Sequence, residues 1–95
     1  MSHAYVVGHI TVKDPAAWDE YRGKVPGTIA PWNAELVFRG KKAGVLAGAN
    51  AHTDIVVIRF PTLDAANDWY ASAAYQALIP IRERAASIDI VIYEA

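Results

Sequence analysis

The chain has 95 residues, of which 54% are hydrophobic and 20% are charged. This length and composition indicate one globular domain over residues 1–95 with a modest core, and they argue against disorder. Nine Lys and Arg residues nearly balance ten Asp and Glu residues, so the net charge of -1 favours neither a nucleic acid nor an anionic membrane as partner. The absence of cysteine excludes disulfides, thiolate catalysis and cysteine zinc sites.

The N-terminal residues lack the basic segment and apolar run of a signal peptide, and no apolar stretch approaches the length of a membrane span. We therefore expect a cytoplasmic protein. The apolar content is high for so small a domain, which suggests that a partner chain covers part of the apolar surface.

The first half of the chain predicts a strand, a helix and a second strand. Residues 4–12 are β-branched and aromatic, as in a strand. Asp14 and Pro15 are typical of a helix start, and we expect Pro26-Gly27 to kink or interrupt that helix. Residues 34–40 predict the second strand, which Val45-Leu46 could prolong beyond a bulge.

The second half predicts a strand, a broken helical region and a last strand. Residues 53–60 form the most apolar strand. Thr62 can cap a second helix, Ser72 can cap a shorter one, and Pro80 should bend the chain before Arg82. Residues 87–94 predict the last strand.

The predicted order of elements is βαββαβ, the α+β ferredoxin-like arrangement. Right-handed crossovers place the four strands in the order 4-1-3-2, with all neighbours antiparallel and both helical regions on one face of the sheet.

The two faces of this predicted sheet differ in polarity. By the period of two, the more apolar even-numbered positions should face the helices: Val6, Ile10, Val12, Leu36, Phe38, Val56, Ile58, Phe60, Ile88, Ile90 and Ile92. The odd-numbered positions are mixed: Tyr5, Val7, His9, Thr11, Glu35, Val37, Arg39, Ile55, Val57, Arg59, Asp89, Val91 and Tyr93. Such a mixture suits a homodimer interface between two sheets.

Residues 69–84, WYASAAYQALIPIRER, contain a recognisable pattern. It resembles the domain of unknown function 1330 family, through Trp69, Tyr70, Ser72, Tyr75, Pro80 and Arg82. Asp14-Pro15, Tyr21 and Pro26 agree with the same family.

The resemblance implies a dimeric α/β-barrel, in which two ferredoxin-like sheets pack face to face, but no established activity. Relatives in that superfamily include cofactor-free monooxygenases, small isomerases and haem proteins, so the fold does not select a reaction. The chain departs from the family's usual pattern at Trp32-Asn33-Ala34-Glu35 and at Ala47.

Few residues suggest chemistry directly. His3, His9 and His52 show no metal-ligand spacing, and we expect neither a metal nor a cofactor. His9 lies on the mixed face, where it is either a hydrogen-bonded interface residue or a general base. Arg82 is the second candidate catalytic residue.

The charged residues of the mixed face have two interpretations as well. Glu35, Arg39, Arg59, Asp89 and Tyr93 are expected to pair among themselves, and an anionic ligand held by Arg39 or Arg59 is the alternative. Arg39-Gly40-Lys41-Lys42 is interpreted as a solvated sheet edge.

An aromatic-rich helical layer is the other candidate site. Trp32, Trp69, Tyr75 and Arg82 are the candidate ligand-binding residues, in a pocket between helices and sheet, although aromatic side chains at helical spacing also simply fill a core. The functional hypotheses are a small-molecule binder, a cofactor-free monooxygenase- or isomerase-like enzyme, and a non-catalytic dimeric module.

Overall fold

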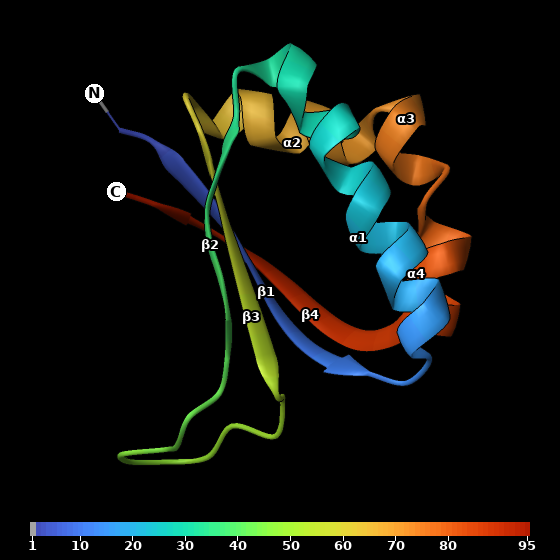
Figure 1. Ribbon diagram of the computed structural model, residues 1–95. Helices are drawn as coiled ribbons and strands as arrows, with labels where there is room; N and C mark the ends of the chain where they lie inside the picture. Colours follow the sequence, from blue (N-terminus) through green and yellow to red (C-terminus); the bar gives the residue numbers. More distant parts are fainter. Residues whose placement is uncertain (1) are drawn as a thin grey trace.

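The computed structural model describes residues 2–95 and shows a four-stranded sheet with all its helices on one face (Figure 1). In chain order the elements are β1 (Ala4–Val12), α1 (Pro15–Ile29), the 3-10 turn η1 (Ala30–Trp32), β2 (Glu35–Lys41), β3 (Asp54–Phe60), α2 (Leu63–Ala71), α3 (Ala73–Gln76), α4 (Ile79–Ala85) and β4 (Ala86–Glu94). The strand order β2-β3-β1-β4, with every pair antiparallel, confirms the predicted order 4-1-3-2. The fold is therefore the ferredoxin-like one that the sequence predicts.

Side-chain caps fix where the helices begin. The Asp14 carboxylate accepts hydrogen bonds from the backbone N–H groups of Ala16 and Ala17, at 3.1 and 3.2 Å. Thr62 Oγ1 accepts from Ala65 N at 3.0 Å. Caps of this kind satisfy N–H groups that have no partner within the helix. They confirm the predicted starts of α1 and α2.

Pro26 does not interrupt α1, contrary to the expectation from its type. The helix continues through Pro26 to Ile29 and passes directly into η1. Pro26 lies in the last turn, so only one hydrogen bond of the helix is lost there. Packing of the buried Tyr21, Val25 and Ile29 against the core holds the turn in place.

A β-bulge in β2 changes which residues face the helices. Leu36 pairs with Ile58, but Phe38 pairs with Val57, so Val37 is an extra residue between them. Beyond the bulge, Arg39 pairs with Val56 and lies on the helix-covered face. The sequence-based assignments of Phe38 to the helix face and Arg39 to the mixed face are therefore wrong, because regular alternation does not survive an inserted residue.

Residues 42–53 form a long connection that projects beyond the sheet (Figure 1). It contains no strand, so the predicted extension of the second strand through Val45-Leu46 is wrong. Leu46 is fully exposed there, and Val45 is 44% exposed.

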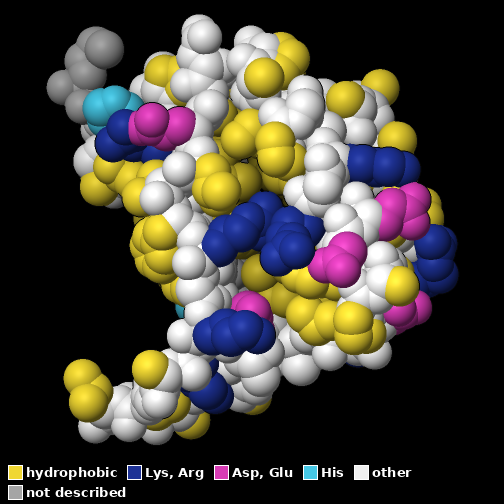
Figure 2. Space-filling model, in the orientation of Figure 1, with side chains coloured by type: hydrophobic (Ala, Val, Ile, Leu, Met, Phe, Trp, Pro, Cys, Tyr) yellow, Lys and Arg dark blue, Asp and Glu magenta, His cyan; other side chains and the backbone are white. Residues whose placement is uncertain are grey.

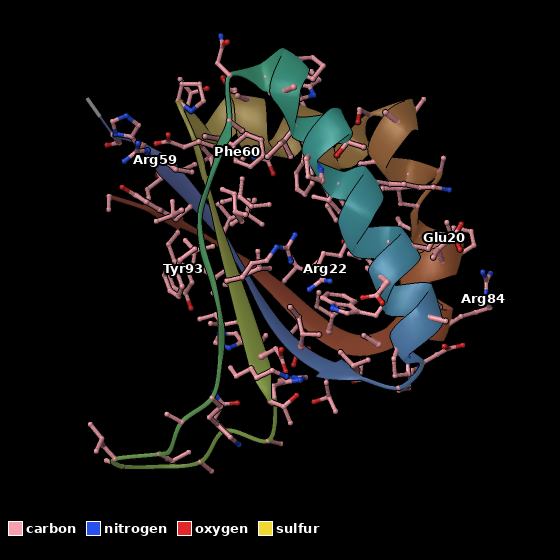
Figure 3. The ribbon with its side chains drawn as sticks, in the orientation of Figure 1. Glu20, Arg22, Arg59, Phe60, Arg84 and Tyr93 are labelled. Carbon is pink, nitrogen blue, oxygen red and sulfur yellow. The ribbon has the colours of Figure 1, made fainter. Side chains whose placement is uncertain are left out.

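The core lies between the sheet and the helices. Ala4, Val6 and Ile10 of β1 and Ile58 and Phe60 of β3 are buried against aromatic side chains of α1, α2 and α3. Figure 3 shows Phe60 pointing toward the helices, whereas Arg59 and Tyr93 point to the opposite face of the sheet. We call that uncovered side the outer face.

The outer face retains apolar side chains at the surface. Phe38, Val91 and Tyr93 are 49%, 40% and 53% exposed. Arg59 and Glu35 form an ion pair on the same face, as the sequence suggests for charges placed there. None of the helices formed by residues 2–95 combines the length and apolar character needed to cross a membrane.

Candidate functional site

An aromatic cluster occupies the space between the helices and the sheet. The Trp69 ring lies 4.4 Å from that of Tyr75 and 5.2 Å from that of Phe60, measured between centroids. Tyr70 lies 5.1 Å from Tyr75. Tilted and edge-on contacts between aromatic rings at these distances are favourable, so the rings of the cluster stabilise one another.

Three phenols and one guanidinium form a polar network inside this apolar layer. The hydroxyls of Tyr21 and Tyr75 lie 2.7 Å apart. Arg82 Nη1 donates to the hydroxyls of both Tyr70 and Tyr75, each at 3.1 Å. The network joins α1 to the α2–α4 segment, since Tyr21 and Tyr75 are 54 residues apart in the chain.

Burial sets the protonation state of Tyr21. Desolvation, then the neighbouring Tyr75, raises the pKa of the Tyr21 phenol well above its ordinary value of 10.0. Tyr21 is therefore neutral at physiological pH and keeps its proton for donation.

Arg82 brings a permanent positive charge to the network. Burial by itself would lower the pKa of Arg82, but hydrogen bonds to Tyr70 and Tyr75 outweigh it and raise that pKa. Arg82 is only 8% exposed, and its Nε–H has no hydrogen-bond partner among the described residues. Arg82 Nη2 also pairs with the exposed Glu83 carboxylate at 3.1 Å, so the guanidinium is held by the two phenols on one side and by a carboxylate on the other.

The Trp69 indole is held by a second chain of hydrogen bonds. Its Nε1–H donates to Thr28 Oγ1 at 3.0 Å, and that hydroxyl donates to the Val25 carbonyl at 2.7 Å. Both bonds are buried, so they fix the orientation of the indole against α1.

A narrow cavity, here called the slot, lies between this cluster and the sheet. It measures about 20 Å³, which is room for about one water molecule. Its walls are Val6, Gly8, Trp18, Tyr21, Val25, Arg39, Val56, Ile58, Trp69, Tyr75, Ile88 and Ile90. Gly8 lets the side chains of Val56 and Ile88 pack against the backbone of β1, because a Cβ there would lie 2.9 Å from Val56 Cγ1 and 3.4 Å from Ile88 Cδ1.

Wider spaces adjoin the slot at both ends. A cleft of about 190 Å³ beside α2 shares Val6, Trp69 and Ile90 with it. A groove between α1 and the β2 edge shares Trp18 and Arg39 with the slot. The part of the groove next to Arg39 measures about 220 Å³, and the part further from the slot measures about 580 Å³. A small molecule could therefore reach the slot from the surface on either side.

Arg39 stands where the groove meets the slot. Burial and then the charge of Arg22 lower the pKa of Arg39, because both disfavour its protonated form. Among residues 2–95, no carboxylate lies within ion-pair distance of the Arg39 guanidinium. The mouth of the slot is therefore electropositive.

A separate polar cluster lies at the outer face. His52 Nε2 lies 2.7 Å from Asp89 Oδ2, and His52 Nδ1 lies 3.0 Å from Thr11 Oγ1. The His9 ring stacks on His52 at 6.3 Å between centroids. No group of three or more metal-ligating side chains gathers anywhere in residues 2–95.

The structure separates the candidate residues taken from the sequence. Trp69 and Tyr75 line the slot, and Arg82 lies behind Tyr75 and binds its hydroxyl. Trp32 packs against the core but is not a wall of the slot. His9 lies on the outer face, so the two candidate catalytic residues, His9 and Arg82, belong to different sites.

Sequence reasoning did not single out Tyr21 or His52 as site residues, and it offered Arg39 as a candidate for holding an anion but on the opposite face of the sheet. Tyr21 carries a signal that could have found it, since it is a polar aromatic on the buried stripe of α1. The position of Arg39 depends on the bulge, and that of His52 on the path of the connecting loop, which no local pattern in the sequence indicates.

The arrangement combines flat apolar walls with hydroxyl groups that can donate hydrogen bonds, around a space that now holds about one water molecule. The aromatic walls supply contact area, and the Tyr21–Tyr75–Arg82 network supplies donors next to a fixed positive charge. Such a group can donate to a carbonyl oxygen and stabilise negative charge that develops on it.

Comparison with solved structures shows the same fold in proteins of distant sequence. A protein of unknown function from Rhodopseudomonas palustris has a TM-score of 0.81 at 10% identity, over 97% of this chain and 81% of that one. SnoaB, a cofactor-independent oxygenase from Streptomyces nogalater, has a TM-score of 0.73 at 11% identity, over 100% and 94%.

A dimeric ferredoxin-like protein of unknown function from Jannaschia sp. CCS1 has a TM-score of 0.74 at 13% identity, over 98% of this chain and 99% of that one. No curated protein matches the sequence. The match of a family model over residues 3–95 shows that the chain belongs to the family described as domain of unknown function DUF1330.

Proposed function

We propose that this protein binds a small organic molecule in the slot, between the aromatic cluster and the sheet. The observation that carries the proposal is the buried Tyr21–Tyr75–Arg82 network, which ends in hydroxyls at the wall of a cavity. A core that only needed filling gains little from a buried cation, because desolvating a charge is costly. An interaction of the Arg82 network with a bound ligand would offset this desolvation cost.

The slot must widen to accept such a molecule, because it now holds about 20 Å³. The adjoining cleft and groove give the space into which a ligand can extend. Arg39 lies on an edge strand, and an edge strand is paired on one side only. Movement of β2 therefore disturbs fewer hydrogen bonds than movement of a central strand.

The experiment is a thermal-shift screen of small aromatic acids, amides and ketones against the wild-type protein and Gly8→Val. The added side chain starts from a Cβ at 2.9 Å from Val56 Cγ1, so Val56, which is also a wall of the slot, must shift and the sheet side of the slot becomes crowded. We expect stabilisation of the wild-type protein by some compounds and a loss of that shift in Gly8→Val. Equal shifts in the two proteins would show that binding occurs elsewhere, and no shift across the panel would contradict the proposal.

The second candidate function is cofactor-free enzymatic chemistry of the oxygenase or isomerase type. It is favoured by the Tyr75 phenol at the wall of the slot, which could donate a hydrogen bond to the carbonyl oxygen of a bound ketone, with the Arg82 charge directly behind it. The fold shared with SnoaB is compatible with this chemistry but does not assign it. Turnover of a bound ketone that is lost in Tyr75→Phe, with binding retained, would support it over simple binding.

We also propose that the protein is a homodimer through its outer face. Apolar residues exposed there, among them Phe38, Val91 and Tyr93, alternate with the Arg59–Glu35 pair and the His52–Asp89 contact. That mixture suits an interface with embedded polar pairs. The dimeric assembly of structural neighbours from Jannaschia sp. CCS1 and Thermobifida fusca is consistent with it.

A further inference from the structure

We propose that the ligand of the slot is an organic anion, whose carboxylate is held at the mouth by Arg39 and Arg22. This inference rests on the proposed function and adds the chemical class of the ligand.

The groove is electropositive although the whole chain is slightly acidic. Its walls include the cations Arg22, Arg39, Lys41 and Lys42, against the two carboxylates Asp19 and Asp54. Four positive and two negative side chains leave a local excess of two positive charges, in a chain of net charge -1. Figure 2 shows Lys and Arg side chains gathered on this face, between β2 and α1.

The acids that line the groove do not neutralise Arg39. Asp19 pairs with Arg22 at 3.1 Å, and Asp54 accepts a hydrogen bond from Thr53 Oγ1 at 2.8 Å. Arg39 itself has no carboxylate partner among the described residues and is partly buried. A half-desolvated guanidinium without a counter-charge is unfavourable, and an incoming carboxylate would supply the counter-charge.

The β-bulge is what brings Arg39 to this position. With regular alternation and no bulge, Arg39 would lie on the outer face, opposite Ile55. The bulge turns it to the helix-covered face, where it is a wall of both the slot and the groove. Re-aiming a side chain into a site is a recurrent use of bulges.

Arg22 is the second half of the proposed anion site. Figure 3 shows its side chain extending from α1 toward the sheet. It is a wall of the groove next to Arg39, and the one ion pair that it makes within residues 2–95 is the exposed, weak pair with Asp19. Two guanidinium groups facing one space can bind both oxygens of a carboxylate, while the organic part enters the slot past Trp18, which lines both the groove and the slot.

The test measures dissociation constants by isothermal titration calorimetry for 2-naphthoate, for its neutral amide 2-naphthamide, and for acetate. The proteins are the wild type, Arg39→Gln, Arg22→Gln and the control Arg84→Gln, which removes the same charge from the far side of α4 (Figure 3). We expect 2-naphthoate to bind the wild type more tightly than the amide does. Arg39→Gln should weaken naphthoate binding by about 10- to 100-fold and leave amide binding unchanged.

The remaining outcomes distinguish failure of the anion site from failure of binding in the slot. Equal affinity for acid and amide, or equal naphthoate affinity in the wild type, Arg39→Gln and Arg22→Gln, would overturn the anion site and leave slot binding intact. Acetate binding that depends on Arg39, without any gain from the naphthyl ring, would support the anion site and contradict the slot. Binding of none of the three probes by the wild type would overturn both proposals. Should Arg39→Gln fold poorly, Arg22→Gln replaces a half-exposed side chain of the same groove, and its affinities for naphthoate and for the amide give the same comparison of acid with amide.

Discussion

At the scale of single residues, Tyr75 is the residue on which the polar network depends. Its hydroxyl contacts both Tyr21 and Arg82, and the side chain is completely buried. Removing that oxygen leaves two buried groups without their partner, which costs more than the loss of one exposed bond.

We therefore predict that Tyr75→Phe lowers the free energy of unfolding by about 1–3 kcal/mol, measured by urea denaturation. Asp68→Ala removes polar atoms at an exposed position of α2, on the helical side of the sheet, and should stay within about 0.5 kcal/mol of the wild type. Equal effects of the two substitutions would mean that the network contributes nothing to stability.

Tyr21 makes stability depend on pH in the alkaline range. Its pKa is raised in the folded protein, so above pH 10 the unfolded chain loses this proton while the folded chain keeps it. The free energy of unfolding must then fall as pH rises, by up to about 1.4 kcal/mol per pH unit from this group.

Tyr21→Phe removes this contribution and should flatten the profile between pH 10 and 11 relative to the wild type. Urea denaturation at each pH measures it, and comparing the two proteins cancels the titration of the remaining tyrosines and lysines. Parallel pH profiles of the wild type and Tyr21→Phe would show that the Tyr21 phenol has the same pKa in the folded and unfolded states.

Local residue types predicted the caps but not the network. Asp14, Thr62 and Ser72 accept from N–H groups within three residues, so their roles follow from the adjacent sequence. The Tyr21–Tyr75 contact joins residues 54 positions apart, and its partners are set by the packing angle of the helices. The sequence placed Trp69, Tyr75 and Arg82 near a pocket, and only the packing shows why Trp32 is not one of its walls.

At the scale of secondary-structure elements, the bulge in β2 decides the chemistry of both faces of the sheet. Alternation predicted β1, β3 and β4 well because their pairing is regular along its whole length. An inserted residue in β2 reverses the alternation after it, and nothing in the run from Glu35 to Arg39 marks where the insertion falls.

The register of β2 has a direct test in two charged substitutions. Phe38→Glu should destroy the proposed dimer, since Phe38 lies on the outer face, whereas Leu36→Glu, on the other face, should leave it intact. Light scattering at micromolar concentration measures both masses. A dimeric Phe38→Glu beside a dimeric Leu36→Glu would mean that the regular alternation, which places both residues on the helix face, was right.

At the scale of the whole molecule, one layer of helices covers only one face of the sheet. The outer face keeps Phe38, Val91 and Tyr93 at the surface, and monomeric proteins rarely leave such residues uncovered together. A partner sheet would bury them and bring the His52–Asp89 and Arg59–Glu35 pairs into the interface.

The dimer predicts that Val57→Glu, at the centre of the outer face on β3, yields a monomer by light scattering. A charge there would be buried without a partner in the dimer. Ala74→Glu, at an exposed position of α3 on the helical side, is the control and should remain dimeric. A wild-type protein of monomer mass at micromolar concentration would contradict the interface.

The central claim is that a small molecule enters the slot, and the three tryptophans of the chain can report on it directly. Trp18 and Trp69 are walls of the slot and Trp32 is not, so their indole N–H signals form an internal comparison. The measurement is a titration with 2-naphthoate followed in the ¹H–¹⁵N spectrum, with signals assigned from single Trp→Phe variants. The account predicts that the Trp18 and Trp69 signals shift with one saturation curve while Trp32 stays in place; movement of Trp32 alone, or of none of them, would contradict it.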